Sequence, residues 1–380
     1  ELRGSRERAE HMAAIAPEAL APVVPPARPG FERFVTREPV GIVFTVAPWN
    51  YPYLTTVNSV VPALIAGNAV ILKHAAQTLG VGDRFQAAFD ATDLPKGLFQ
   101  HLVLDNEQTL GLISGGHVDH VAFTGSVEAG RTIERACAGT FTTCGLELGG
   151  KDPAYVRPDA DFDYTIEQLV DGAFFNAGQC CCGIERIYVH ADVHDRFLDA
   201  YTTAVSRYVL ADPLDPATTL GPMARTAFAE TVRAQTAEAV AKGARALIDP
   251  KLFPASKVGT PYLMPQVLTG VDHSMTVMCE ESFGPVVGIM KVADDAEAVR
   301  LMNDSRYGLT ASIWTADVAA VRAIDQELEF GTVFMNRCDY VDPGLVWTGV
   351  KDTGRGAALS AVGYETLTRP KSHHYKLTTP

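Results

Sequence analysis

Three adjacent cysteines, Cys180, Cys181 and Cys182, are the side chains of this sequence best suited to nucleophilic chemistry. They follow an asparagine and a Gly-Gln step within FFNAGQCCCGIER, residues 174–186. A thiol attacks carbon efficiently only as its thiolate, so its surroundings must favour negative charge or supply a base. Because buried cysteine also behaves as a small apolar side chain, we interpret Cys180 and Cys182 as packing residues.

A single carboxylate, Glu147, stands in the short apolar stretch CGLELGGK, residues 144–151. An acid in such surroundings is either a base with a raised pKa or a surface residue out of place. If it is a base, it is a candidate partner for the cysteine nucleophile.

Asn50 lies in APWNYP, residues 47–52, directly after an apolar run that predicts a buried strand. Its amide could donate to a developing oxyanion, where one well-placed donor contributes about 3 kcal/mol. The alternative is an asparagine that only closes the turn.

TGSVEAG, residues 124–130, follows a predicted strand and begins a predicted helix. Gly125 and Ser126 would offer backbone donors and a hydroxyl at a helix N-terminus, which suits a phosphate group. Lys73 ends another predicted strand, AVILK, and either binds a phosphate or ribose or faces water.

Other site classes are disfavoured. DADFD, residues 159–163, resembles the start of a calcium loop, but Tyr164 and Val170 replace the glycine and glutamate that such a loop needs, so helix capping explains it better. The sequence has no G-x-G-x-x-G, P-loop, G-x-S-x-G or H-E-x-x-H motif. No C-x-x-C pair recurs and the ten histidines lie away from the cysteines, so we expect no metal site.

Composition predicts a globular protein with two domains, since 380 residues with 47% hydrophobic and 20% charged side chains can bury a large core. The net charge of −13 argues against a nucleic-acid partner. No apolar run approaches the ~20 residues that span a bilayer, and the opening residues lack a signal-peptide core. Seven cysteines, an odd number, favour reduced thiols, so we expect a cytoplasmic protein.

Alternating strands and helices predict an α/β fold with mostly parallel sheets that bind ligands at the carboxyl ends of their strands. We expect a helix over 1–18, then a proline-rich break and two β-rich pieces split at residues 37–39. Further helices are expected over 55–66, 78–92, 106–114, 126–138, 162–176, 192–208, 222–241 and 317–326, and strands over 40–46, 69–73, 99–103, 117–123, 145–148, 186–190, 286–292, 310–314 and 332–336.

Taken together, these motifs resemble the NAD(P)-dependent aldehyde dehydrogenase family over nearly the whole chain. The matching motifs occur in the family's order: PWNYP, ILK, FTGS with its later glycine, LELGGK, FxNxGQxC, EExFGPV at 280–286, NxxxYGL at 303–309 and GxKxTGxG at 349–356. The resemblance implies an aldehyde dehydrogenase-like α/β fold with a Rossmann-type cofactor domain, an α/β catalytic domain and a β oligomerisation arm.

The resemblance also implies a role for each matching residue. Cys181, the sixth residue of NAGQCC, would attack the aldehyde carbonyl, and the Asn50 amide and the Cys181 backbone N–H would hold the oxyanion. Hydride transfer to the nicotinamide would leave a thioester, which water activated by Glu147 would hydrolyse to the carboxylic acid.

The implied cofactor contacts fall on six positions. They are Glu281 on the nicotinamide ribose, Phe283 as its packing partner, Trp49, Gly125 and Ser126 at the pyrophosphate, and Lys73 at the adenosine ribose. Many family members have a carboxylate three residues after the lysine, where this chain has Ala76. Because that carboxylate repels a 2′-phosphate, the cofactor is left open as NAD or NADP.

The implied domains are a cofactor-binding domain over 1–149, with an oligomerisation hairpin at about 20–38, a catalytic domain over 150–352, and a C-terminal return and oligomerisation strand over 353–380. The chain starts after the helices that usually open family members. We expect the strand-prone tail to pair with a sheet edge, either in this chain or in a partner subunit, within a homodimer or homotetramer.

The substrate class is only loosely specified. By the resemblance, Tyr53, Phe175, Trp347 and Tyr340 approach the substrate tunnel and suit an apolar, aromatic or cationic aldehyde, while Arg337 keeps a semialdehyde open. A coenzyme A-acylating dehydrogenase is the rival enzyme, against which Glu147 argues, since a thiol acceptor needs no such base. A non-catalytic scaffold is the rival from another class.

Overall fold

The computed structural model describes residues 1–378, which form two compact units. The first unit comprises Glu1–Leu148, Val341–Thr348 and the chain from Gly354 onward. The second unit comprises Gly149–Tyr340 and Gly349–Thr353. No helix among the described residues is both long and apolar enough to cross a bilayer.

A six-stranded sheet in the order β16-β6-β5-β2-β3-β4 forms the centre of the first unit. Its strands are β2 (Ile42–Val46), β3 (Ala69–Lys73), β4 (Phe99–His101), β5 (His120–Thr124), β6 (Thr143–Glu147) and β16 (Gly354–Arg355). All neighbours pair in parallel except β16, which is antiparallel to β6. The central strands are buried, as Val43, Phe44 and Leu72 show, because helices cover the sheet on both faces.

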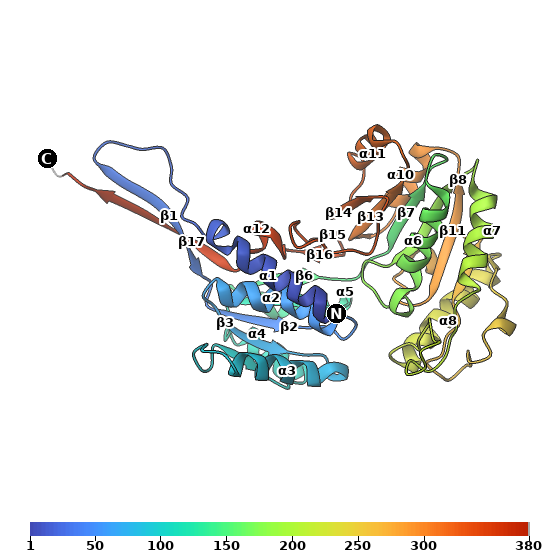
Figure 1. Cartoon of the computed structure of the whole chain (residues 1–380). Coiled ribbons are helices and arrows are strands. Elements are labelled where there is room, and N and C mark those ends of the chain that lie inside the picture. Colours follow the sequence, from blue (N-terminus) through green and yellow to red (C-terminus); the bar gives the residue numbers. More distant parts are fainter. Residues whose placement is uncertain (379–380) are drawn as a thin grey trace. The chain divides into compact units, whose positions relative to one another are not determined.

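Helix α1 packs against α2, and α4 packs against α5, around this sheet (Figure 1). The helices of the unit are α1 (Leu2–Ala19), α2 (Pro52–Ile65), α3 (Leu79–Asp90), α4 (Asn106–Ser114), α5 (Val127–Cys137) and α12 (Ser360–Gly363), with a 3-10 turn at Ala76–Thr78. Pro52 stands at the first position of α2, where its missing N–H costs nothing.

A two-stranded antiparallel ribbon extends away from the sheet of the first unit (Figure 1). It pairs β1 (Phe31–Pro39) with β17 (Thr368–Lys376) over their full lengths. The expected break at residues 37–39 is wrong, because β1 continues through Pro39 and the chain leaves the strand only at Val40 and Gly41. The tail does pair with an edge, and the edge belongs to the same chain.

The second unit is built on a seven-stranded sheet in the order β14-β13-β7-β8-β11-β10-β9. Its strands are β7 (Asp152–Val156), β8 (Ile184–His190), β9 (Arg245–Ala246), β10 (Gln266–Thr269), β11 (Val286–Val292), β13 (Thr310–Trp314) and β14 (Thr332–Met335). Only β9 runs antiparallel to its neighbour. A separate pair joins β12 (Tyr307–Gly308) to β15 (Val350–Lys351).

Helices of the second unit pack on this sheet around a large apolar core. They are α6 (Phe162–Phe174), α7 (His194–Val205), α8 (Thr226–Ala241), α9 (Thr276–Cys279), α10 (Asp295–Asn303) and α11 (Val318–Asp325), with 3-10 turns at Phe175–Gly178 and Pro250–Leu252. The expected helices and strands of both units are confirmed, with ends that differ by a few residues.

Nine helices and strands among residues 1–378 were not expected from the sequence, namely α9, α10, α12, β7, β9, β10, β12, β15 and β16. Strand β7 begins with Asp152 and Pro153, and its pairing with β8 changes register between these two residues. A proline argues against a central strand, so the sequence did not indicate β7. Helix α10 is only nine residues long. Asp294 caps its N-terminus by accepting the Glu297 N–H at 2.9 Å.

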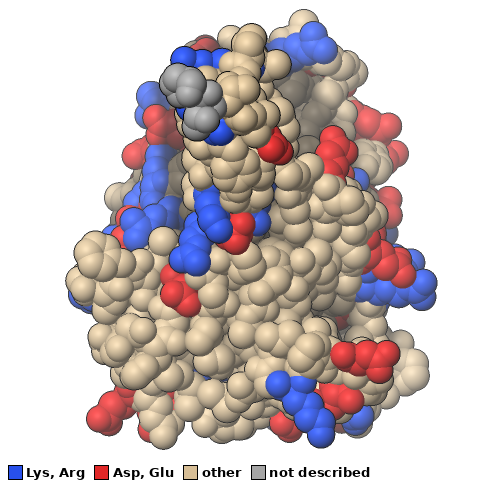
Figure 2. All heavy atoms as spheres, turned by 90° about the vertical axis from the view of Figure 1, so that its left-hand side faces the viewer, with Lys and Arg blue, Asp and Glu red and all other residues tan. Residues whose placement is uncertain are grey.

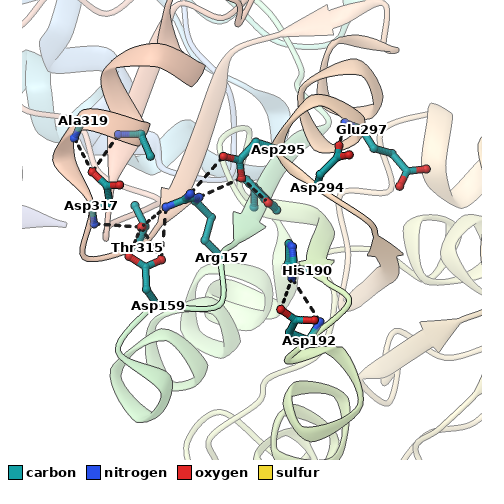
Figure 3. Close-up of polar contacts among 12 residues, drawn as sticks. Arg157, Asp159, His190, Asp192, Asp294, Asp295, Glu297, Thr315, Asp317 and Ala319 are labelled. Carbon is teal, nitrogen blue, oxygen red and sulfur yellow. Dashed lines mark hydrogen bonds and ion pairs between the residues drawn. The ribbon is translucent and has the colours of Figure 1, made fainter.

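A charged network joins the carboxyl ends of β7 and β13 to α10 (Figure 3). Arg157, which follows β7, donates to both oxygens of Asp295 at 3.0 and 3.2 Å and to Thr315 at 3.0 Å. Asp159 accepts from the Thr315 hydroxyl at 2.7 Å. Two residues on, Asp161 caps α6 by accepting the Tyr164 N–H, as expected for DADFD.

Candidate active site

Four neighbouring parallel strands of the first unit, β3, β2, β5 and β6, end at one edge of its sheet. Register pairs Val46 with Lys73 and Thr124 with Glu147 at these ends. The turns that follow β2 and β5 carry Asn50 and Ser126. The predicted site residues of this unit therefore lie at the carboxyl ends of adjacent strands, where parallel sheets bind ligands.

Glu147 is the last residue of β6, and burial raises its pKa to about 7. A hydrogen bond from the Thr124 hydroxyl at 3.3 Å and the positive charge of Arg8 act in the opposite direction. Glu147 and Thr124 border a cavity of about 40 Å³ with polar groups of Thr45 and His120 in its wall. A cavity of that size holds a few water molecules. Near neutral pH this carboxyl group can therefore both accept and return a proton.

Ser126 caps helix α5, and its hydroxyl accepts the Ala129 N–H at 3.4 Å. The Gly125 N–H is used within the sheet edge, where it donates to the Glu147 carbonyl at 3.1 Å. Lys73 ends β3, and partial burial lowers its pKa. The N-terminus of α5 and the Lys73 ammonium group each suit an anionic group such as a phosphate.

Trp49 and Asn50 lie in the turn between β2 and α2, both half-buried. Tyr53, in the first turn of α2, packs its ring 5.8 Å from that of Phe85 in α3. Trp347 is buried and forms a bridge with Ala358 within the same unit.

The predicted nucleophile of the second unit, Cys181, follows an unusual turn. Asn176, Ala177 and Gly178 all have left-handed backbone angles, with φ of 51°, 55° and 70°. A Cβ atom on Gly178 would lie 2.3 Å from the carbonyl oxygen of Gly284. Only glycine therefore allows the FxNxGQxC turn to pack against the EExFGPV segment.

Cys181 is half-buried, whereas Cys180 and Cys182 are 5% and 4% exposed. Interactions with the thiols of Cys180 and then Cys182 lower the pKa of Cys181, against burial and the nearby Asp152 carboxyl group, which raise it. A lowered pKa increases the thiolate fraction, which is the nucleophilic form.

The expectation that Cys180 and Cys182 only fill space is incomplete. Both are buried, and both thiols also donate to Oδ1 of Asp339, at 2.9 and 3.2 Å. Each thiol has one proton, so it is shared between this carboxyl group and the Cys181 sulfur. Sequence patterns could not show this role of Asp339, because it lies 159 positions after Cys180 in the sequence.

Glu281 and Phe283 stand on the loop between α9 and β11. The Gly150 N–H donates to Oε1 of Glu281 at 3.1 Å, and a Cβ atom on Gly150 would lie 2.6 Å from the Cys181 carbonyl oxygen. Gly150 thus lets the Cys181 backbone and the Glu281 loop approach the same point. Burial, with a smaller contribution from Glu185, raises the pKa of Glu281 to about 8.

Sequence reasoning missed a buried ion pair between Lys151 and Glu185 that organises this loop. Glu185 accepts the backbone N–H groups of Ser282 at 2.9 Å and Phe283 at 2.8 Å. Lys151 also donates to the Ser282 hydroxyl at 3.0 Å. The available signal was a glutamate inside the apolar strand β8, since buried acids require a partner.

Two further predicted residues of the second unit lie near the surface. Phe175 is 53% exposed. The guanidinium of Arg337 stacks 3.4 Å above the ring of Tyr340. Both members of this cation–π pair flank Asp339 in the sequence.

Comparison with known proteins identifies the family. Residues 1–373 match the family model described as "Aldehyde dehydrogenase family". A relative named aldehyde dehydrogenase from Paenarthrobacter nicotinovorans is 36% identical over 340 residues, which cover 88% of this chain and 72% of the relative. A succinate semialdehyde dehydrogenase [NAD(P)+] from Escherichia coli (strain K12) is 34% identical over 326 residues, with 86% and 70% coverage.

Solved structures agree with this result. A succinic semialdehyde dehydrogenase from Streptococcus pyogenes in complex with NADP+ has a TM-score of 0.92 at 28% identity and covers 98% of this chain and 81% of its own. An aldehyde dehydrogenase from Mycobacterium tuberculosis complexed with NAD+ has a TM-score of 0.91 at 32% identity, with 97% and 76% coverage. The expected aldehyde dehydrogenase-like α/β fold is confirmed.

Proposed function

Because the chain belongs to the aldehyde dehydrogenase family, we propose that it oxidises an aldehyde to a carboxylic acid with NAD or NADP as hydride acceptor. The observation that carries the proposal is a complementary pair of titrating groups. The pKa of the Cys181 thiol is lowered and the pKa of Glu147 is raised to about 7, which suits a nucleophile and a base respectively.

Cys181 begins the reaction as a thiolate that attacks the aldehyde carbon and forms a carbon–sulfur bond. The negative charge moves to the carbonyl oxygen, where the Asn50 amide and the Cys181 N–H are the proposed donors. A bound nicotinamide would supply the hydride acceptor for this carbon. The carbonyl re-forms, and Cys181 then carries the acyl group as a thioester.

Glu147 completes the cycle by taking a proton from water, whose oxygen attacks the thioester carbon. The carbon–sulfur bond breaks, the acid leaves, and Cys181 returns to the thiolate. A coenzyme A-acylating enzyme remains the alternative, but a thiol acceptor would not need a base with a pKa near 7. The non-catalytic alternative is disfavoured, because the nucleophile, the base and the cofactor positions are all retained.

The residues of the first unit fit a dinucleotide. The N-terminus of α5 at Gly125 and Ser126 offers a seat for the pyrophosphate, Lys73 suits the adenosine ribose, and Trp49 stands on the adjoining turn. In the second unit, we assign Glu281 to the nicotinamide ribose and Phe283 to its packing. Ala76 replaces the carboxylate that would repel a 2′-phosphate, which leaves both dinucleotides acceptable.

For the substrate, we favour an aldehyde that carries a carboxylate at its other end, and Arg337 is the cation proposed to bind this carboxylate. Stacking on Tyr340 holds its guanidinium in one orientation and leaves its donors available. Several relatives are named succinate semialdehyde dehydrogenases, although another is named geranial dehydrogenase. The proposed tunnel residues Tyr53, Phe175 and Trp347 provide the apolar wall.

We also propose that the protein is a homodimer or homotetramer that works in the cytoplasm. An isolated two-stranded ribbon is marginal in water, so β1 and β17 need another surface to cover them. Figure 2 shows this ribbon pointing towards the viewer above a broad area with few charged side chains. All seven cysteines are free, which suits a reducing compartment.

The direct test follows the absorbance of reduced nicotinamide with NAD and with NADP. The aldehyde panel should include succinic semialdehyde, a neutral aliphatic aldehyde, an aromatic aldehyde and an amino aldehyde. We expect turnover with release of free acid. A coenzyme A thioester as the product would support the acylating alternative, and dinucleotide binding without turnover of any aldehyde would support the scaffold.

A further inference from the structure

Three potential metal ligands converge beside the proposed nucleophile. The Sγ atoms of Cys180 and Cys182 and a carboxylate oxygen of Asp339 all lie within 4.8 Å of one another. The two sulfur atoms are 3.6 Å apart, and Oδ1 of Asp339 lies 2.9 Å from the first and 3.2 Å from the second. All three residues belong to the second unit, so the cluster is complete within one compact part of the chain.

These distances come close to those that a tetrahedral zinc ion requires. Bonds of about 2.3 Å to sulfur and 2.0 Å to oxygen place two sulfur ligands about 3.8 Å apart and a sulfur and an oxygen about 3.5 Å apart. The observed sulfur–sulfur distance differs from the first value by a few tenths of an ångström. The sulfur–oxygen distances must lengthen by roughly 0.3–0.6 Å, which small side-chain rotations provide.

The backbone holds the ligands in place before any ion arrives. Cys180 and Cys182 lie between the left-handed FNAG turn and strand β8, and both are almost fully buried. Asp339 adopts a left-handed backbone conformation with φ of 47°, which turns the segment after β14 back towards the cysteines. Such a conformation costs about 1 kcal/mol or more in a residue other than glycine.

We propose that Cys180, Cys182 and Asp339 form a binding site for a thiophilic divalent cation of the Zn²⁺ class. Two sulfur ligands and one carboxylate favour Zn²⁺ over Mg²⁺ or Ca²⁺, which prefer all-oxygen sites. On binding, each thiol releases its proton to solvent and forms a bond to the ion, so two protons leave for each ion bound. The fourth position remains for a water molecule or the Cys181 sulfur.

A simpler interpretation is a hydrogen-bonded cluster in which two thiols satisfy a buried carboxyl group. That interpretation accounts for the hydrogen bonds, but it does not require both thiols to approach the same carboxylate oxygen. Cys338, the residue next to Asp339, shows the ordinary arrangement, since its thiol donates to the backbone carbonyl of Gln168 at 3.6 Å. The convergence of two non-adjacent thiols on one oxygen atom is what distinguishes the cluster.

Cation binding would inhibit the proposed reaction, because the ion would sit between the two neighbours of Cys181. It would remove the thiol donors that interact with the Cys181 sulfur or bind that sulfur directly. This consequence depends on the proposed function, whereas binding itself does not. Binding and turnover therefore have to be measured separately.

The test uses the purified full chain after treatment with a chelator. Co²⁺ is added as a spectroscopic probe, and thiolate-to-cobalt charge-transfer absorption is recorded, followed by displacement with Zn²⁺. We expect one equivalent of cobalt, two protons released, and protection of Cys180 and Cys182 from alkylation as measured by mass spectrometry of the wild-type protein. The last readout needs no variant, so it is unaffected by misfolding.

Substitutions then assign the ligands. Loss of a residue that only supports a metal ligand typically weakens metal binding about 10–100-fold. Cys182→Ser and Asp339→Asn each remove a ligand itself, so they should weaken Zn²⁺ binding by more than this. Cys338→Ser is the matched control, since it changes a half-buried thiol next to Asp339 but outside the cluster, and it should bind as the wild type does. The proposal is overturned if wild-type protein gives no charge-transfer band, or if the band survives in Cys182→Ser. An active enzyme with no cobalt band would refute only the cation site, and a cobalt band without turnover would refute only the proposed function.

Discussion

The hydroxyl of Thr124 should set the pH at which acyl release becomes fast. It donates to the Glu147 carboxyl group at 3.3 Å and so stabilises the charged form. Burial acts in the opposite direction and prevails, which places the pKa of Glu147 at about 7. Thr124→Val removes the donor at nearly constant volume, and the pKa of Glu147 should rise further.

The size of the effect follows from the hydrogen bond. A bond of this length contributes about 1 kcal/mol, which corresponds to a rise of roughly 0.7 in the pKa of Glu147. Only the deprotonated carboxylate can take a proton from water, so acyl release increases with pH through the pKa. At about pH 6 the variant should therefore release the acyl group roughly fivefold more slowly, whereas at about pH 9 the two proteins should be equal.

The assay is a stopped-flow measurement of reduced nicotinamide over a range of pH. The burst reports hydride transfer, and the steady rate after it reports thioester hydrolysis when hydrolysis is the slower step. Thr124→Ser keeps the hydroxyl and should keep the wild-type profile. An acid limb in Thr124→Val that stays in place or moves to lower pH would show that the hydroxyl does not stabilise the catalytic carboxylate.

Three further changes probe the same chemistry and the frame around it. Cys181→Ala should abolish turnover but keep the stabilisation by the dinucleotide, which is about 2.7 kcal/mol at 100 times its Kd and is seen as a rise in melting temperature. Unchanged turnover would remove Cys181 from the mechanism. Glu147→Gln should leave a burst followed by a slow steady rate, and normal steady turnover would mean that another group activates water. Because the folded pKa of Glu147 is above its ordinary value of 4.5, the charge destabilises the fold at higher pH, so this variant should also melt at a higher temperature at about pH 8 but not at about pH 4. Glu185→Gln leaves Lys151 buried without its counter-ion and should cost about 3–5 kcal/mol in denaturant unfolding, whereas Asp195→Asn, in an exposed pair with Lys291, should change little.

Local patterns predicted most of the longer helices and strands of this chain and the residues at their ends. Glu147 and Ser126 were recognisable because each ends or follows a strand of clear apolar character, and parallel pairing then brings such ends to one edge. The same logic failed for β7, whose Asp152 and Pro153 interrupt the apolar pattern although all five residues are buried. A central strand buried by neighbours on both sides needs no periodic pattern of its own.

Contacts between segments far apart in the sequence account for what could not be predicted. The thiol of Cys180 meets the carboxyl group of Asp339 across 159 positions, and Lys151 meets Glu185 across 34. Asp339 and Glu185 lie outside the residues to which the family motifs give a chemical role. Asp339 nevertheless contacts the neighbours of the proposed nucleophile, and Glu185 holds the Phe283 loop through its backbone. Buried acids are costly unless paired, so each forces a specific partner into place. An acid in a buried strand, such as Glu185, therefore indicates that a partner exists, but the fold and not the local sequence decides which residue becomes that partner.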